Sequence, residues 1–108
     1  MTQIRIFREK SDKTVIDIKG HAGFNPGNDI VCAGVSTLAY ALINLIQTMS
    51  ERRELKEILI KDSSGDIHIE AVHDNDQDSK WDDVVEFFIT GIAMLEEHYP
   101  NHVNLSVS

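Results

Sequence analysis

Alternating apolar and polar residues predict four β-strands that pair as two hairpins. Ile4 and Ile6 alternate with charged neighbours, and residues 15–18 form a β-branched run. Both patterns are typical of half-buried strands. Polar turn residues separate the two members of each pair. The predicted strands cover residues 3–8, 15–18, 55–61 and 67–72, with turns at 10–13 and 62–66.

A long apolar stretch with a spacing near 3.6 residues predicts a helix after the first hairpin. Its N-cap is Asp29 or Asn28, because a short side-chain oxygen can accept from the free amides of the first turn. The helix ends within residues 50–53. It has little polar surface before Gln47, so we expect it to be buried on most sides.

A second helix is predicted over residues 79–99, where Pro100 stops it. A short strand at 102–107 completes the order β-β-α-β-β-α-β. This order predicts an α+β fold, with two helices packed on a mostly antiparallel or mixed sheet. We expect one domain over residues 1–108. Aromatic residues of the second helix that we expect in the core or in a dimer contact are Trp81, Phe87 and Phe88.

Composition and charge limit the kinds of partner. Hydrophobic residues make up 42% of the 108 residues, which is ordinary for a globular protein. Ten basic and 18 acidic side chains give a net charge of −8. A protein that grips nucleic acid through phosphate contacts needs a basic face, so we expect no direct nucleic-acid binding. The charge favours a basic partner instead.

The single cysteine and the N-terminus indicate a cytoplasmic location. One cysteine can form neither an internal disulfide nor a multi-cysteine zinc site. The N-terminus has no apolar core of the kind that a signal peptide needs. The longest apolar stretch, residues 33–46, is interrupted by polar residues, and we expect it to be too short and too polar to span a bilayer.

Candidate chemistry gathers around a glycine-rich loop at residues 20–29. Cys32 lies just inside the following helix, where free amides and a partial positive charge favour a thiolate and could stabilise an oxyanion. His21 lies at the end of the preceding strand, so the loop can bring it beside Cys32. Such a pair is the minimum for thiol acyl transfer. The alternative is a buried, inert cysteine and an ordinary surface histidine.

Two sequence motifs carry a family resemblance. Residues 20–23 read G-H-A-G, and residues 27–36 read G-N-D-I-V-C-A-G-V-S. Together they resemble the signature of the bacterial ribosomal-processing cysteine protease family Prp, over the whole chain in length and element order. The resemblance implies an α/β fold and a homodimer. It also implies removal of a short N-terminal extension from a large-subunit ribosomal protein, with cleavage after a hydrophobic sequence that contains Phe.

The resemblance implies Cys32 as nucleophile and His21 as general base, and it also covers Asp29 and Ser36. Asp29 either caps the helix or accepts a hydrogen bond from His21, and the local geometry favours capping. Ser36 lies one turn after Cys32. A bond from its hydroxyl to a helix carbonyl is favoured over a catalytic role.

The loop between the two motifs is one residue shorter than is usual in that family, which implies a stiffer variant. Gly23, Phe24 and Gly27 are the residues we expect to contact substrate. Phe24 could offer an apolar surface to a substrate phenylalanine, or it could pack onto the core. A glycine-rich loop over a cysteine could also become ordered only when substrate binds.

A metal or other cofactor is not expected. His68 lies in a predicted strand, facing solvent, while His73, His98 and His102 lie in loops or at helix ends without the paired spacing of a zinc site. The acidic run 74–78 lacks the glycine and glutamate of a calcium loop. It is interpreted as a solvated loop that can steer a basic substrate.

The leading hypothesis is therefore a cytoplasmic cysteine endopeptidase that matures a basic ribosomal protein. The alternative is a non-catalytic acidic module that binds a ribosomal protein or an assembly intermediate, with Cys32 buried. Fast alkylation of Cys32 near neutral pH would favour the enzyme. An RNA-associated factor is a third possibility that the net charge disfavours.

Overall fold

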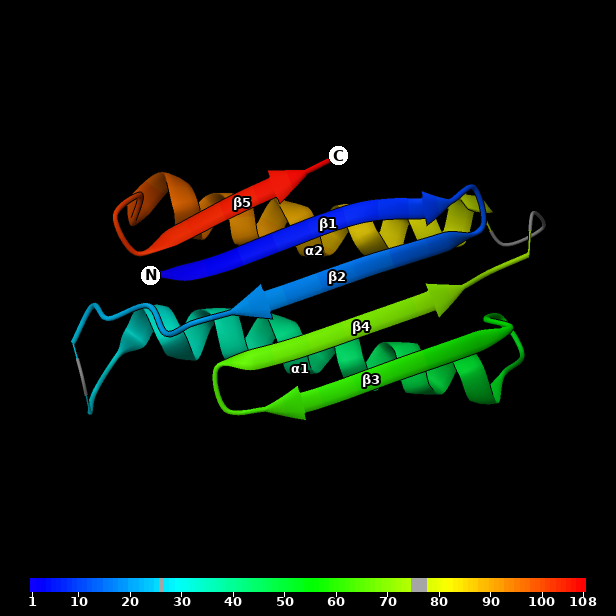
Figure 1. Cartoon of the computed structure of the whole chain (residues 1–108), viewed down its shortest axis with the longest axis horizontal. Helices are drawn as coiled ribbons and strands as arrows, with labels where there is room; N and C mark the ends of the chain where they lie inside the picture. Colours follow the sequence, from blue (N-terminus) through cyan, green and yellow to red (C-terminus); the bar gives the residue numbers. More distant parts are fainter. Residues whose placement is uncertain (26, 75–77) are drawn as a thin grey trace.

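A computed structural model describes residues 1–25, 27–74 and 78–108 and shows a five-stranded sheet with two helices (Figure 1). The elements follow in the order β1 (Thr2–Lys10), β2 (Lys13–Lys19), α1 (Ile30–Glu51), β3 (Glu57–Ser63), β4 (Asp66–Val72), α2 (Asp78–His98) and β5 (Val103–Val107). The predicted fold class and the order β-β-α-β-β-α-β are confirmed.

The sheet has the strand order β3-β4-β2-β1-β5. Each neighbouring pair is antiparallel except β1 and β5, which run parallel. In the central strand, Ile16 is paired with Ile6 of β1 on one side and with Ile69 of β4 on the other. All three side chains are buried. The alternation seen in the sequence thus builds one apolar face on the sheet.

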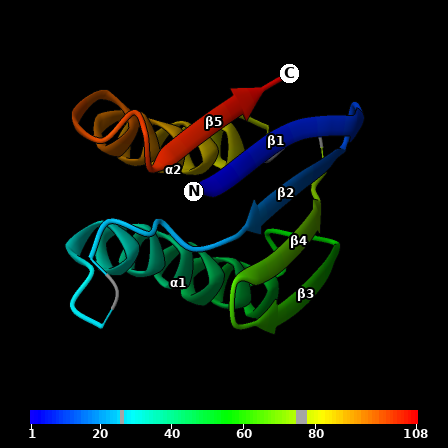
Figure 2. The same ribbon diagram turned by 60° about the vertical axis from the view of Figure 1, so that its left-hand side comes forward.

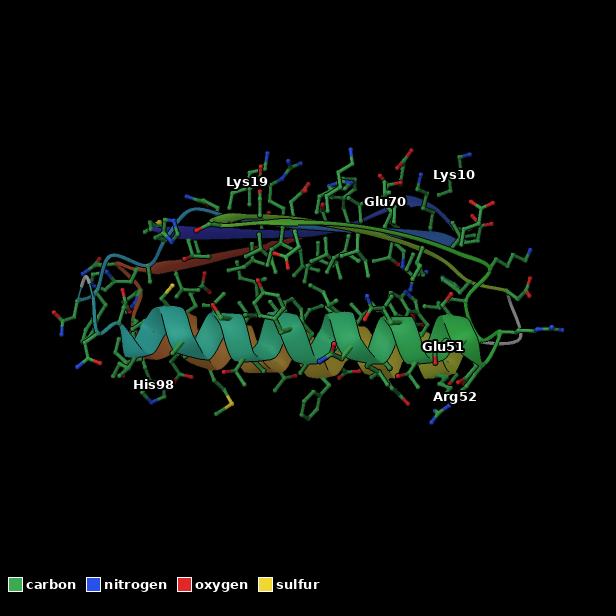
Figure 3. All side chains as sticks on the ribbon, turned by 90° about the horizontal axis from the view of Figure 1, so that it is seen from below. Lys10, Lys19, Glu51, Arg52, Glu70 and His98 are labelled. Carbon is green, nitrogen blue, oxygen red and sulfur yellow. The ribbon has the colours of Figure 1, made fainter. Side chains whose placement is uncertain are left out.

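Both helices cover that apolar face, and the other face of the sheet is open (Figures 1 and 2). Figure 3 shows Lys19 and Glu70 projecting from the open face, whereas His98 projects from the side of the helices. Ile46 of α1 and Ile92 of α2 are fully buried between the layers. Each helix packs one apolar stripe against the sheet, and the two stripes together cover its apolar face.

The strands run further than the alternation of residues predicted. In the first hairpin, Arg8 still pairs with Thr14, and Lys10 pairs with Lys13 across a register irregularity. Backbone pairing therefore continues into charged positions at the end of the sheet. The alternation of apolar and polar residues does not predict this pairing, because the charged residues at the end of the hairpin do not continue the alternation.

Helix α1 is less buried than we predicted. Ile30, Tyr40 and Leu45 are exposed on it. The prediction of burial on most sides was wrong because the helix meets a sheet on one face only and α2 along one flank. Its remaining face is uncovered and carries both apolar and polar side chains.

The expectation that this stretch is too short and too polar to cross a membrane was also wrong. The helix continues to Glu51, and by length and composition its 22 residues would suffice to cross one. Within the fold, Val31, Ala39 and Ile46 of the same helix are buried.

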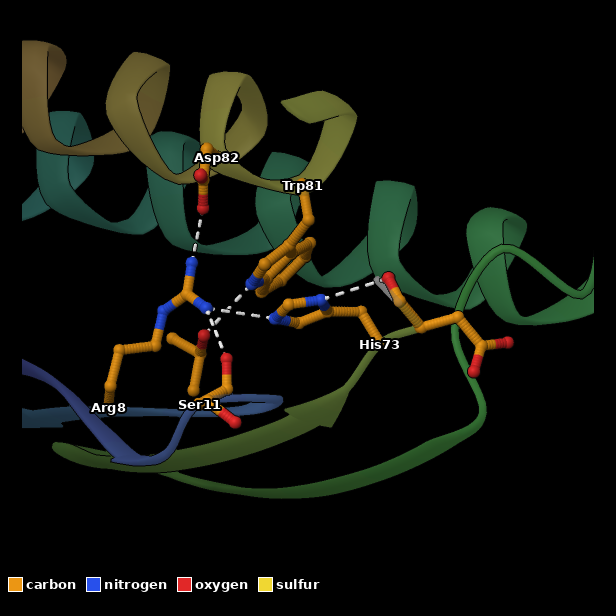
Figure 4. Close-up of polar contacts among 7 residues, drawn as sticks. Arg8, Ser11, His73, Trp81 and Asp82 are labelled. Carbon is orange, nitrogen blue, oxygen red and sulfur yellow. Dashed lines mark hydrogen bonds and ion pairs between the residues drawn. The ribbon is translucent and has the colours of Figure 1, made fainter. Parts of the chain in front are cut away.

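Arg8 links the first hairpin to the start of α2 (Figure 4). Its guanidinium donates to the backbone oxygen of Ser11 (3.1 Å) and to Nε2 of His73 (2.9 Å), and it forms an ion pair with Asp82 of α2. His73 is fully buried. The sequence pattern places His73 in a loop and does not predict that it is buried. The acidic run beyond it falls largely on residues 75–77, which lie outside the described residues.

Trp81 anchors the first turns of α2 to the sheet. It is fully buried, and its indole Nε1 donates to Oγ1 of Thr14 in β2 at 2.9 Å (Figure 4). Thr14 is also buried. A buried indole N–H needs an acceptor, and this threonine supplies it. The expected core position of Trp81 is confirmed.

Candidate functional site

His21 lies two residues after the end of β2. The backbone turns at Gly20, which has a φ of +90° and donates its amide to the backbone oxygen of Gly65 at 2.8 Å. Gly65 lies in the turn between β3 and β4. The exposed side chain of His21 lies against this same turn. The end of β2 and the β3–β4 turn therefore hold His21 at one edge of the molecule.

Cys32 lies in the first turn of α1 and is half-buried. Its backbone amide donates to Oδ1 of Asp29, the N-cap residue, at 2.9 Å. The thiol is therefore carried by a helix start whose backbone is fixed. This is the placement that the sequence predicts for it.

His21 and Cys32 line the same pocket, which has a volume of about 190 Å³. Its apolar lining comes from β2, β4 and α1, and its polar lining includes residues of the β3–β4 turn. The lining residues are Thr2, Ile18, Gly20, His21, Cys32, Val35, Ser36, Ala39, Tyr40, Ser63, Ser64, Gly65, Asp66 and Ile67. A nucleophile and a base at one partly apolar pocket suit cleavage of a peptide next to an apolar residue.

Asp29 holds the loop and the helix start together. Its carboxylate accepts from the amides of Cys32 and Phe24, both at 2.9 Å, and of Asn25 at 3.4 Å. These bonds, that from Cys32 foremost, lower the pKa of Asp29 below its usual value. Of its two expected roles, helix capping is present. The described residues contain no hydrogen bond between Asp29 and His21.

These bonds change one expectation about the chemistry. We expected the amides of the first helical turn to be free for an oxyanion. The Cys32 amide is not free, because the Asp29 carboxylate accepts from it. The N-cap thus occupies one of the amide donors considered for the oxyanion.

Ser36 shares the pocket with Cys32. In the part of the chain that the structure describes, its hydroxyl makes no hydrogen bond to a helix carbonyl, which was the favoured expectation. Thr37, the next residue, makes that type of bond, to Ala33 at 2.8 Å.

The loop residue Phe24 packs on the end of α2. Its ring makes edge-to-face contacts with Tyr99 (5.3 Å between centroids) and His102 (5.4 Å). It does not line the pocket of His21 and Cys32. The ring is 43% exposed, so it packs against this end of the fold without entering the core, and its contact with substrate stays a prediction. Gly23 and Gly27 have positive φ angles and open space around them, and residue 26 lies outside the described residues.

The other histidines have structural contacts. His68 faces the open side of the sheet, as predicted, and its ring contacts Asp17 Oδ1 (2.5 Å) and Glu70 Oε2 (2.8 Å). The hydrogen bond to Glu70, followed by that to Asp17, raises the pKa of His68. His98 bonds to the backbone of its own helix, to Met94. No group of three His, Cys, Asp or Glu residues suited to a metal occurs among residues 1–25, 27–74 and 78–108.

A larger cavity of about 380 Å³ lies elsewhere, between α1 and α2 on the side away from the sheet. It is lined mainly by apolar side chains, including Leu38, Leu45 and Phe87, and contains neither a cysteine nor a histidine. Phe87 is 76% exposed, whereas its neighbour Phe88 is buried. The smaller pocket is therefore the candidate for chemistry, and the larger one belongs to an uncovered apolar surface.

Sequence comparisons point to one family. The profile of the family described as cysteine protease Prp matches residues 1–104. A ribosomal processing cysteine protease Prp from Staphylococcus aureus is 28% identical over 94 residues, which cover 86% of this chain and 85% of the relative.

Solved structures share the fold. The crystal structure of the Staphylococcus aureus ribosomal processing protease Prp with a covalently linked product peptide matches with a TM-score of 0.79 at 24% identity, covering 100% of both chains. A protein from Streptococcus mutans matches with a TM-score of 0.70 at 28% identity, over 99% of this chain and 93% of that one.

Proposed function

Because the chain belongs to the Prp family of ribosomal-processing cysteine proteases, we propose that it removes the N-terminal extension of a large-subunit ribosomal protein. The observation that carries this proposal is the shared pocket of His21 and Cys32 at the start of α1. The expected place of action is the cytoplasm, where such a substrate is made.

In the proposed reaction, His21 takes the proton from Sγ of Cys32. The thiolate attacks the carbonyl carbon of the scissile peptide bond, and the resulting intermediate collapses to a thioester as the C–N bond breaks. His21 returns its proton to the leaving amine. Water, activated by His21, then hydrolyses the thioester and releases the acid.

We assign supporting roles to Asp29 and Ser36. Asp29 fixes the helix turn that carries Cys32, through the amide bond described above. Ser36 contributes a hydroxyl at the pocket that can donate to the developing oxyanion. The Cys32 amide is a poor candidate for that role while Asp29 accepts from it.

Two features support the proposed substrate. The apolar lining of the pocket, which includes Ile18, Val35 and Ile67, suits a hydrophobic sequence that contains Phe. Asp66, which also lines the pocket, and the net charge of −8 suit a basic ribosomal protein. A Prp relative from Staphylococcus aureus has been crystallised with a substrate peptide.

We further propose that two copies of the chain pair through the uncovered face of α1 and α2. Leu45, Phe87 and Met94 are exposed there, and two apolar cavities adjoin them. Large exposed apolar patches of this kind mark interaction surfaces. The residues that line these two cavities are distinct from those that line the pocket of His21 and Cys32.

The test is to mix purified protein with the ribosomal protein that carries its extension and to follow the substrate mass over time. Wild type is expected to shorten it, and Cys32→Ala and His21→Ala are expected to lose this activity. His98→Ala is the matched control, because His98 is exposed and outside the pocket. Stable binding without cleavage by all variants would instead favour the acidic binding module.

A further inference from the structure

We propose that Gly65, in the turn between β3 and β4, is a positioning residue for His21. Its missing side chain provides the space in which the imidazole ring lies. This inference rests on the proposed role of His21 as general base. The β3–β4 turn thereby acts in the reaction although it contributes no reactive group of its own.

The ring of His21 lies so close to Gly65 that no side chain fits between them. An ideal Cβ on Gly65 would lie 2.8 Å from Nε2 of His21, 3.2 Å from Cε1 and 3.4 Å from Cδ2. Carbon atoms in favourable contact are about 3.5 to 4.0 Å apart. The ring would therefore have to move by roughly half an ångström or more to make room.

The same glycine also fixes the backbone that carries His21. Its carbonyl oxygen accepts the amide hydrogen of Gly20 at 2.8 Å. Gly65 thus holds the main chain before His21 and limits the ring that follows. In the described part of the chain, the His21 ring makes no hydrogen bond, so packing determines where it lies.

A side chain at residue 65 should harm catalysis more than folding. The ring of His21 is exposed and can swing away from a new Cβ at little cost. Gly65 has a φ of +72°, and this left-handed conformation disfavours alanine more than asparagine. The fold already contains a non-glycine residue in the left-handed conformation, because Arg53 has a φ of 62°.

This difference separates backbone strain from ring displacement. Gly65→Ala brings both a Cβ and strain, whereas Gly65→Asn brings the Cβ with less strain. If Gly65 positions His21, both variants should lose about 100-fold in kcat with little change in KM, since a displaced catalytic group costs about this much. Gly65→Asn should show the smaller fall in melting temperature.

A second readout does not depend on activity. The ¹H–¹³C resonance of the His21 imidazole, assigned with His21→Ala, is expected to shift in both Gly65 variants while the resonance of His98 stays in place. Wild-type kcat in folded Gly65 variants, or an unshifted His21 resonance, would overturn the proposal. If the wild type cleaves no ribosomal protein, the proposed function fails, and the resonance alone decides whether Gly65 positions the ring.

Discussion

The hydrogen bond between Trp81 and Thr14 allows a quantitative test of what holds α2 to the sheet. Both residues are buried, and the indole Nε1 lies 2.9 Å from Oγ1. Thr14→Val keeps the shape of the side chain but leaves the indole N–H without its acceptor. Leaving such a group unsatisfied costs about 1 to 3 kcal/mol in unfolding free energy. Thr14→Ser keeps the acceptor and removes one methyl group, which costs about 0.8 kcal/mol.

The order of stability of the two variants therefore shows whether the lost hydrogen bond or the lost methyl group costs more. We expect Thr14→Val to be the less stable, with a melting temperature lower by roughly 5 to 10 °C for a domain of this size. Thermal unfolding, followed by circular dichroism at one protein concentration, measures the melting temperature of both variants. In a Trp81→Phe background no indole N–H remains, so Thr14→Val should cost little. If Thr14→Val were as stable as Thr14→Ser, packing rather than the hydrogen bond would hold the helix.

Three further predictions concern other parts of the molecule. Phe87→Ser should convert the proposed dimer to a monomer in analytical ultracentrifugation, whereas Val107→Ser, at an exposed apolar position of β5, should leave it a dimer. An unchanged sedimentation coefficient for Phe87→Ser would contradict the proposed interface. The raised pKa of His68, due first to Glu70 and then to Asp17, means that its stabilising contribution is complete below about pH 6.5 and is lost as the pH rises through the raised pKa. Thermal melts from pH 5.5 to 9 should show this loss in wild type and not in His68→Gln, and parallel curves would disprove the linkage. The lowered pKa of Asp29, due first to the Cys32 amide, gives a contribution that is present above pH 3.8 and is lost as the pH falls through the lowered pKa. Asp29→Ala should therefore melt lower than wild type at pH 6, by a margin that narrows as the pH falls below 3.8, and equal melting at pH 6 would argue against the cap.

Local patterns predicted the elements because each depends on near neighbours. The alternation at Ile4 and Ile6 identifies a strand with one buried face, and the spacing of Trp81, Phe88 and Ile92 identifies a helix with one buried stripe. The strand order could not be predicted in this way. It depends on which edges meet after folding, and the parallel pairing of β5 with β1 joins residues from opposite ends of the chain.

The candidate site was predictable only in part. The motif around His21 and Cys32 predicts that they share a site, and both line one pocket. The contact of His21 with Gly65 was not predictable, because the glycine belongs to a distant hairpin whose turn gives no chemical signal. The burial of His73 was missed for a similar reason. Its donor is Arg8, far away in sequence, and its acidic neighbours resemble a solvated loop.

The parallel pairing of β5 with β1 also has a consequence for the order of folding. The two hairpins join residues that are close in sequence, whereas Val103–Val107 must find a partner in Thr2–Lys10 across nearly the whole chain. Closing so large a loop costs entropy before the contact repays it, so this pairing should form after the hairpins. Until then the outer edge of β1 offers unpaired backbone groups to other chains. The folding chain is thus most open to misassembly in the period before β5 docks. In the native protein, the amides of β5 should be among the first of the sheet to exchange with solvent.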